Sequence, residues 1–438
     1  HIINNKIFSN TTLLYSRYVF NNLISNNNEL INIYSDLSQT ISNENSDYLY
    51  KSGIEDIGVR LDFDYAINKN HYFKFGASYI KHIFFPGEME FTSESEEFSY
   101  TSNAIFSKHL KPNDFSIYFE DLFTITNRFT ANLGIHQSLF SIDKKIYQAT
   151  QPRLSLRYLL NEKSSVKLSY AIMQQHIHLL TNSSYGLPND MWVPTTEFVP
   201  PSSSEQIVCG YHKSFNNNIY EASIEIYHKS MKNLITFSEG SNVIATNFSS
   251  WADRIEMNGT GKSNGLELFL KKNNGKFTGW LGYTLSKTTR QFDNINLGRE
   301  YSYKFDRTHD ISIVCNYQMN NQINFSATWI YGTGNTMTMP IAQYLLIDGN
   351  QINEFFEYGS KNDFRMPAYH RLDISCNVIK QKNGKTSSWT IGIYNIYNRN
   401  NPFFITLDNE IVDGIRRKVA KQISLFPIIP SLKYNFKF

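Results

Sequence analysis

The stretch "IGVRLDFDYAI", residues Ile57 to Ile67, alternates between apolar and polar residues. Each odd position carries a large apolar side chain, while Arg60, Asp62 and Asp64 fall between them. Successive side chains of an extended strand point to opposite faces, so this segment has one apolar face and one charged face. Helical spacing does not fit this pattern. The stretch therefore predicts a β-strand that separates two different environments.

The same alternation recurs in later segments. It is found in "RLSLRYLL" (153–160), "SVKLSYAI" (165–172), "NGLELFLKK" (264–272), "INFSATWIY" (323–331), "WTIGIYNIY" (389–397) and the last eight residues, "SLKYNFKF" (431–438). Cys209, Cys315 and Cys376 share the apolar positions of their segments and lack CxxC spacing. They are expected to be small apolar residues, and neither zinc ligands nor disulfide partners.

The connections between these segments are alternately very short and long. The short ones are polar turns at 68–70, 126–128, 161–163, 216–218, 273–275, 320–321 and 382–384. The long ones are mainly 84–113, 175–203, 231–261, 288–304, 334–365 and 399–420. In an up-and-down sheet this alternation places all turns on one rim and all long loops on the other. That is the layout of an outer-membrane barrel, with periplasmic turns and extracellular loops.

The fold class predicted from these patterns is all-β, a transmembrane antiparallel up-and-down β-barrel that occupies residues 1–438. Counting from Thr11 gives roughly sixteen strands, with the apolar face toward lipid and the polar face toward a lumen. The sequence has no run of 18 apolar residues, which argues against a helical span but not against barrel strands. A soluble propeller or sandwich has the same period, although no blade repeat is seen.

Charge and the chain ends add further expectations. A net charge of +3 without a basic stripe gives no reason to expect a nucleic-acid partner. His1 is not an initiator Met, so we expect a processed or truncated end, with a leader or a whole domain missing. At the other end, Tyr434, Phe436 and Phe438 are expected to face lipid on the strand that closes the barrel by pairing with the first strand.

Several stretches together resemble one family. They are "LPNDMWVPTTEFVPPSSSEQ" (187–206), "GWLGYTLSKTTRQFDNIN" (279–296), "FDRTHDISIV" (305–314), "MPAYHRLDIS" (366–375) and "NIYNRNNPF" (395–403). They resemble the C-terminal barrel of TonB-dependent outer-membrane receptors, particularly the Bacteroidetes type. The resemblance implies a 22-stranded barrel plugged by an N-terminal domain. Because no plug and only about sixteen strands are seen, the plug and the first strands are expected to be absent from this chain.

The resemblance implies an energised nutrient importer of the bacterial outer membrane that binds a scarce substrate through its extracellular loops. The implied partners are the TonB system acting through a plug, the barrel insertion machinery that reads the terminal aromatic strand, the lipid bilayer, and a surface lipoprotein or separate plug-bearing chain. A passive 16-stranded porin and an adhesion or scaffold barrel are the alternatives. No catalytic motif appears in a confirming context, so we expect no enzyme activity and no cofactor.

Two charged stretches supply candidate lumen-wall residues. "FDRTHD" contributes Asp306, Arg307, His309 and Asp310, and "YHRLD" contributes Arg371 and Asp373. These groups suit an anionic ligand or a metal chelate. The alternative, favoured here, is that they pair with one another across neighbouring strands and line the wall.

The long loops supply candidate substrate-binding residues. Tyr185, Trp192 and Trp251 lie among Asn, Ser and Thr, where rings that stack and amides that orient suit sugar or peptide capture. The alternative is that these rings only pack the loops together. His176 and His178 share one face at a loop entrance and are candidates for a two-histidine metal contact, although two imidazoles alone rarely form a site. No resident metal is expected.

Overall fold

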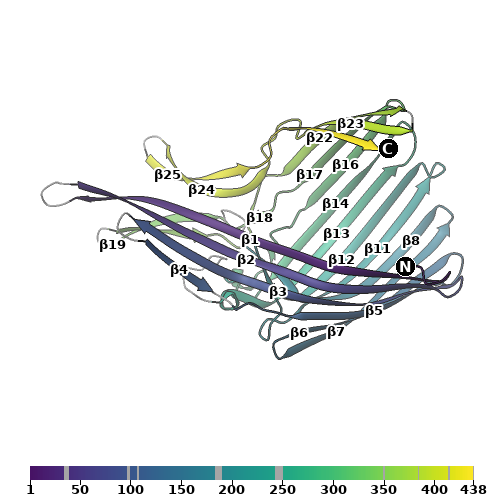
Figure 1. Cartoon of the computed structure of the whole chain (residues 1–438), viewed down its shortest axis with the longest axis horizontal. Coiled ribbons are helices and arrows are strands. Elements are labelled where there is room, and N and C mark those ends of the chain that lie inside the picture. The colour runs from purple at the N-terminus through teal and green to yellow at the C-terminus, as the bar shows by residue number, and fades with distance from the viewer. Residues whose placement is uncertain are drawn as a thin grey trace.

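The structure is a computed structural model that describes residues 1–33, 39–95, 99–105, 108–182, 190–241, 250–348, 351–382, 384–412 and 415–437. Antiparallel strands dominate it, and they form a strongly curved wall (Figure 1). Within these residues, no helix has the length and apolar character that crossing a membrane requires.

The wall is one continuous antiparallel sheet. Of the 18 strands that the sheet contains, β4 (Ser99–Ile105) and β15 (Tyr301–Ser302) are short rim strands, and the other sixteen pair in chain order. The sixteen are β1 (Ile7–Ile33), β2 (Gln39–Ala66), β3 (His71–Ser95), β5 (Asn113–Thr124), β6 (Phe129–Ile142), β7 (Lys145–Asn161), β8 (Ser164–Gln175), β11 (Ser202–Phe215), β12 (Tyr220–Phe237), β13 (Ile255–Lys272), β14 (Phe277–Gln291), β16 (His309–Gln318), β17 (Ile323–Gly332), β22 (Tyr369–Lys382), β23 (Lys385–Tyr394) and β26 (Ile429–Lys437). The predicted fold class and strand number are confirmed for the part of the chain that is described.

Asparagine side chains shape the short turns at one rim. Asn68 Oδ1 accepts hydrogen bonds from the backbone N–H groups of Asn70 and His71, at 2.8 and 3.0 Å. Asn216, Asn217 and Asn218 all have positive φ, between 50° and 64°. Asparagine tolerates this left-handed conformation because its side chain bonds to the local backbone. The polar turns predicted from the sequence therefore join neighbouring strands, and they lie at the end of the wall that carries both termini (Figure 1).

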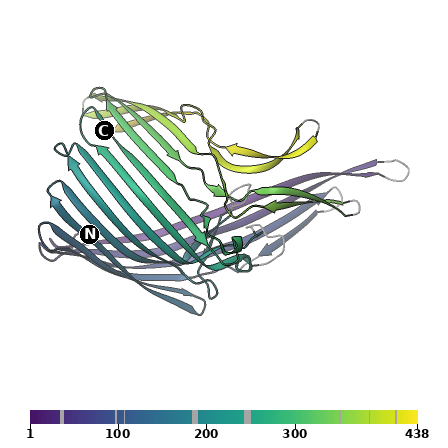
Figure 2. The ribbon, with the colours of Figure 1, turned by 180° about the vertical axis from the view of Figure 1, so that it is seen from behind.

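The long connections at the other rim are largely ordered β structure. They contain the paired strands β9 (Ile177–Thr181) and β10 (Asp190–Pro194), β18 (Thr336–Met337) and β21 (Phe364–Arg365), β19 (Pro340–Asp348) and β20 (Gln351–Tyr358), and β24 (Pro402–Val412) and β25 (Ile415–Ser424), as well as the 3-10 turns η1 (Trp251–Arg254) and η2 (Asn296–Gly298). β1 and β2 have 27 and 28 residues, far more than the roughly ten that cross a bilayer. Their paired ends project beyond the rim (Figures 1 and 2).

The wall has two unpaired edges. Within the described residues β1 pairs only with β2, and β26 pairs only with β23. The two views show β1 and β26 on separate sides of an open, trough-shaped sheet (Figures 1 and 2). The expected pairing of the last strand with the first strand of this chain is therefore wrong. Sixteen strands curve into most of a barrel but do not bring the two edges together.

Candidate functional site

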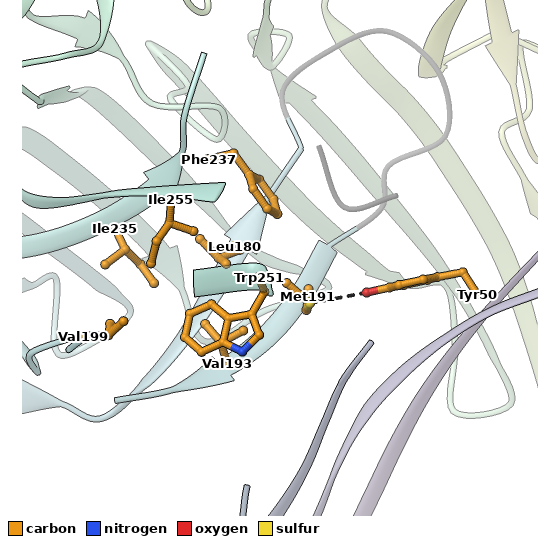
Figure 3. Packing of buried hydrophobic residues seen from close by; sticks show 9 residues of the cluster. All are labelled: Tyr50, Leu180, Met191, Val193, Val199, Ile235, Phe237, Trp251 and Ile255. Atoms are coloured by element: carbon orange, nitrogen blue, oxygen red, sulfur yellow. Dashed lines mark hydrogen bonds between the residues drawn. The ribbon is translucent and has the colours of Figure 1, made fainter. Parts of the chain in front are cut away.

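A hairpin of β9 and β10 contacts β12 as well as β2 and β3, which are distant strands of the curved sheet, so it spans the concave side of the wall at the long-loop rim. Leu180, Met191 and Val193 are fully buried on one face of this hairpin. They belong to an apolar cluster that we call the mouth cluster, and Figure 3 shows its nine residues: Tyr50, Leu180, Met191, Val193, Val199, Ile235, Phe237, Trp251 and Ile255. Because these residues come from β2, β9, β10, the β10–β11 connection, β12, η1 and β13, the cluster joins distant parts of the wall.

Polar contacts fix the position of the same hairpin. Lys304 Nζ lies 3.2 Å from Asp190 Oδ1 at the start of β10. The backbone N–H of Thr195 donates to the carbonyl of His176 over 2.7 Å. The Tyr50 hydroxyl donates to Met191 Sδ at 3.3 Å, the dashed line in Figure 3. The hairpin is therefore part of the folded interior at this rim.

His176 and His178 lie at the base of the hairpin and are both buried. The His176 ring stacks on Phe140 with a centroid distance of 4.6 Å and an interplanar angle of 4°. His178 Nε2 lies 3.2 Å from Thr195 Oγ1, and its Nδ1 lies 3.4 Å from Ser202 Oγ. The two rings are held by different partners, and the described residues contain no group of three or more His, Cys, Asp or Glu that could hold a metal ion. The arrangement does not support a two-histidine metal contact.

Burial is the main cause that lowers the pKa of both imidazoles to about 4, and electrostatic interactions with His82 at His176, and with His176 and Arg290 at His178, act in the same direction. Both rings are therefore neutral at pH 7. In the unfolded chain they take up protons below pH 6.5, whereas in the folded chain they do so only near pH 4. Each histidine thus favours opening of the hairpin as the pH falls from about 6.5 to 4.

We expect the free energy of local opening of β9–β10 to fall by about 2 kcal/mol per histidine between pH 7 and pH 5. Hydrogen exchange of the β9 and β10 amides, corrected for the intrinsic effect of pH, measures this change. In His178→Gln one titrating group is lost, so the pH dependence should be roughly halved. An opening free energy that is the same at both pH values would contradict this account of the histidines.

The three candidate aromatic residues have different positions. Trp251 is only 3% exposed and belongs to the mouth cluster, so its proposed role as a substrate-stacking ring is wrong in this structure. Trp192 lies between the buried Met191 and Val193 on β10, on the opposite face of the strand, and is half-buried. Tyr185 lies outside the described residues. Trp192 remains a candidate for contact with a ligand.

Asp306 forms a buried ion pair. Its side chain is 2% exposed, Arg365 Nη2 lies 2.6 Å from Asp306 Oδ2, and the Thr288 N–H donates to Oδ1 at 2.6 Å. Arg365 Nη1 also donates to the carbonyls of Asp306 and Gly334. The pair ties the β15–β16 connection to β21, and the burial of Asp306 leaves its carboxylate inaccessible to a ligand.

The neighbouring charges lie on different faces. Arg307 and Asp310 pair at 3.3 Å at the rim, with exposed fractions of 44% and 45%. His309 has the same parity as Ile311 and Ile313, and its Nδ1 lies 2.9 Å from the Tyr283 hydroxyl. Side chains alternate along β16, so His309 belongs to the apolar face. Its prediction as a lumen-wall residue is wrong.

Arg371 and Asp373 do lie together on the polar face of β22. Arg371 Nη2 is 2.9 Å from Asp373 Oδ2, and the guanidinium carbon lies 4.0 Å from the centre of the Tyr394 ring. Asp373 Oδ1 accepts the backbone N–H of Asn395 at 2.9 Å. The pair stabilises the end of β22 against β23. This arrangement favours the alternative that these charges pair with one another and line the wall, over a ligand site.

Polar pairs across neighbouring strands line the concave face elsewhere. The Tyr118 hydroxyl on β5 donates to Asp62 on β2 at 2.7 Å, across Gly76 of β3. A Cβ atom at Gly76 would lie 2.7 Å from the Tyr118 ring and 2.4 Å from the Leu61 carbonyl oxygen. Glycine is therefore required for this contact across three strands. The contact fixes the Tyr118 hydroxyl and the Asp62 carboxylate on this face of the sheet.

A cavity of about 350 Å³ opens beside the mouth cluster, among the ends of β9, β12 and β20. Its lining includes Thr181, Ser238, Glu239, Tyr358 and Lys361. Lys361 Nζ donates to Thr236 Oγ1 at 3.1 Å and to the Phe237 carbonyl at 2.8 Å. Sequence reasoning missed Lys361 and Glu239 because each is an isolated charge in a long connection, and only the fold brings them to one cavity.

The last strand exposes its aromatic residues. Tyr434 and Phe436 of β26 are 51% and 50% exposed, on the face that carries Leu432. Trp389 of β23 lies beside them, with a centroid distance of 4.7 Å to Tyr434. Phe438 lies outside the described residues. A lipid-facing role for Tyr434 and Phe436 agrees with their place on the apolar face, and a role of this strand in assembly stays a prediction.

Comparison with solved structures shows barrels of the same fold. The ferric-catecholate import receptor Fiu of E. coli K12, in its closed form, is 14% identical with a TM-score of 0.59, over 99% of this chain and 62% of that one. The ferric yersiniabactin uptake receptor FyuA of Yersinia pestis is 10% identical with a TM-score of 0.60, over 97% and 62%. For BauA, the ferric preacinetobactin receptor of Acinetobacter baumannii, the values are 10%, 0.54, 99% and 61%. The chain thus spans about 62% of the first of these receptors.

A family model supplies the assignment. No curated protein matches the sequence. The model described as "TonB dependent receptor-like, beta-barrel" matches residues 4–398, which is most of the chain. This match agrees with the sixteen-stranded wall, its short-turn rim and its lipid-type apolar face, and it places the chain in the outer membrane. The chain belongs to the β-barrel family of TonB-dependent receptors.

Proposed function

We propose that this chain is the larger part of the wall of an outer-membrane receptor that takes up a scarce nutrient with energy from the TonB system. The observation that carries the proposal is the family match over residues 4–398 on a wall with a polar concave face. The ferric-catecholate and ferric yersiniabactin receptors, which share its fold, are named for import and uptake. A receptor that moves its ligand intact requires no catalytic centre, so we propose no enzyme activity.

Further strands complete the wall in this proposal. An unpaired strand edge in lipid leaves backbone N–H and C=O groups without partners, at a cost of several kcal/mol for each group. The free edges of β1 and β26 therefore require pairing with strands outside the described sheet. About six strands would give the 22 of the large plugged barrels. The same missing part would include the plug, on this polypeptide or on a companion chain.

The mouth cluster supplies the extracellular end of the pathway in this proposal. It fixes the β9–β10 hairpin over the concave side of the wall, where a ligand held by the loops would meet a plug from above. Movement of the plug by TonB would then open the lumen and release the ligand inward. Binding through a surface lipoprotein and the Bacteroidetes-type subgroup stay predictions.

Conductance in planar bilayers tests this function. The native complex purified from outer membranes should pass little current because a plug fills the lumen. The same barrel assembled without a plug should conduct ions freely, by more than about tenfold over the native complex, because the lumen of a 22-stranded barrel is wide. Equally high conductance in the two preparations would contradict a plugged importer and would favour a passive porin.

A further inference from the structure

Within the part of the chain that the structure describes, Lys361 carries a positive charge beside the cavity described above and forms no ion pair. Its two hydrogen-bond acceptors, Thr236 Oγ1 and the Phe237 carbonyl, are both neutral. The Tyr301 ring lies 5.9 Å from its Nζ. Among the described residues, no carboxylate lies within ion-pair distance of this ammonium group. An ammonium carries three N–H donors, so one donor and the full charge remain for another group.

Burial lowers the pKa of Lys361 to about 8, while the carboxylates of Glu239 and Glu256 act in the opposite direction. The side chain is still mainly charged at pH 7. A charged group held in a poorly hydrated place is stabilised by any anion that reaches it. The cavity provides the space for such an anion, and Thr181, Thr338 and Ser238 line the same space.

Glu239 places an opposite charge in the same cavity. It is exposed, and its Oε1 accepts the backbone N–H of Asn296 at 2.6 Å. The backbone N–H of Lys361 donates to the side-chain oxygen of the same Asn296 at 3.3 Å. Asn296, which has a positive φ of 56°, therefore connects the backbone of Lys361 to the carboxylate of Glu239. The cavity thus has one cationic and one anionic group held by a common residue.

We propose that this cavity binds a zwitterionic, peptide-like ligand, with the ligand carboxylate at Lys361 and its ammonium group at Glu239. A ligand with only a negative charge, such as a phosphate, would meet repulsion from Glu239. A cavity of about 350 Å³ is within the range that holds small ligands. The proposal rests on the uptake function and adds a substrate class to it.

Calorimetric titration of the purified outer-membrane protein with three probes tests the proposal. The probes are trialanine, its N-acetyl form and its C-terminal amide. Wild type should bind trialanine about tenfold more tightly than either blocked form, since each block removes one charge-assisted hydrogen bond. Lys361→Met should abolish the preference for the free carboxylate and keep the preference for the free amine. Glu239→Gln should have the reverse effect.

Two further variants control for damage to the fold. Lys361→Arg keeps the charge and should retain at least part of the carboxylate preference. Lys421→Met removes an exposed lysine that pairs with Asp408 at 2.7 Å on the β24–β25 hairpin, and it should leave all three affinities unchanged. Equal affinity of wild type for the three probes, or binding of none of them, would overturn the proposal. Full carboxylate preference in Lys361→Met would also overturn it. The conductance measurement does not depend on any of these outcomes.

Discussion

Asp306→Ala is expected to lower the free energy of unfolding of the long-loop rim by about 3 kcal/mol. The substitution removes the buried partner of Arg365 and the acceptor of the Thr288 N–H. Loss of one member of a buried pair costs about 3 to 5 kcal/mol because the other charge is left unpaired. We take the lower end because the Arg365 side chain is 30% exposed, so water recovers part of the loss.

The midpoint of urea unfolding, followed by the heat-modifiable migration of the barrel in gels, measures this loss. Asp310→Ala is the matched control. Asp310 also pairs with an arginine, Arg307 at 3.3 Å, but both side chains are well exposed, and such a pair contributes about 1 kcal/mol or less. If Asp306→Ala and Asp310→Ala shifted the midpoint equally, the ion pair of Asp306 would not be the structural element that we describe.

Trp251→Ala is expected to have the largest effect on the position of the β9–β10 hairpin. The indole is almost fully buried among the residues of the mouth cluster, beside Met191 and Val193 in Figure 3. Truncation of a buried tryptophan to alanine costs about 3 to 5 kcal/mol through lost apolar burial and the cavity left behind. The equilibrium constant for local opening should therefore rise by at least about 100-fold.

Limited proteolysis within β9 and β10, together with hydrogen exchange of their amides, measures that opening. Trp192→Ala is the control, because Trp192 lies on the opposite face of β10 and is only half-buried. It should raise the opening constant by less than about tenfold. A larger effect from Trp192→Ala than from Trp251→Ala would mean that the two faces of the hairpin had been assigned wrongly.

The sequence alone was sufficient for the architecture of the wall. The period of two in segments such as 57–67 and 323–331 requires extended strands with two unlike faces. This alternation can be recognised in each strand separately, without knowledge of its neighbours in the sheet. Turn chemistry is equally local, since Asn68 accepts hydrogen bonds from backbone N–H groups two and three residues later, and the Asn216–Asn218 run adopts the left-handed conformation that a tight turn needs. Strand number, order and direction follow from counting these local signals, and the described wall agrees with them.

The candidate site was much less accessible from sequence. Trp192 and Trp251 have the same residue type and similar polar neighbours in the long loops. Only packing against Leu180 and Ile255 separates the buried ring from the half-buried one. His309 and Asp310 were grouped because they are adjacent in sequence, yet adjacent side chains of a strand lie on opposite faces. For the wall residues this alternation is present in the sequence itself, whereas the sequence around the two loop tryptophans carries no signal that distinguishes them.

The sequence by itself determined that this protein is a β-wall with an apolar and a polar face, because alternation and turn formation depend on neighbouring residues. Tertiary structure alone decided that β1 and β26 do not pair with each other, that Trp251 is buried, and that Lys361 and Glu239 meet at one cavity. Those features depend on contacts between segments far apart in the chain, such as Lys361 with Thr236. Sequence periodicity carries no information about such distances, because it specifies the face of each side chain but not the segment that packs against it.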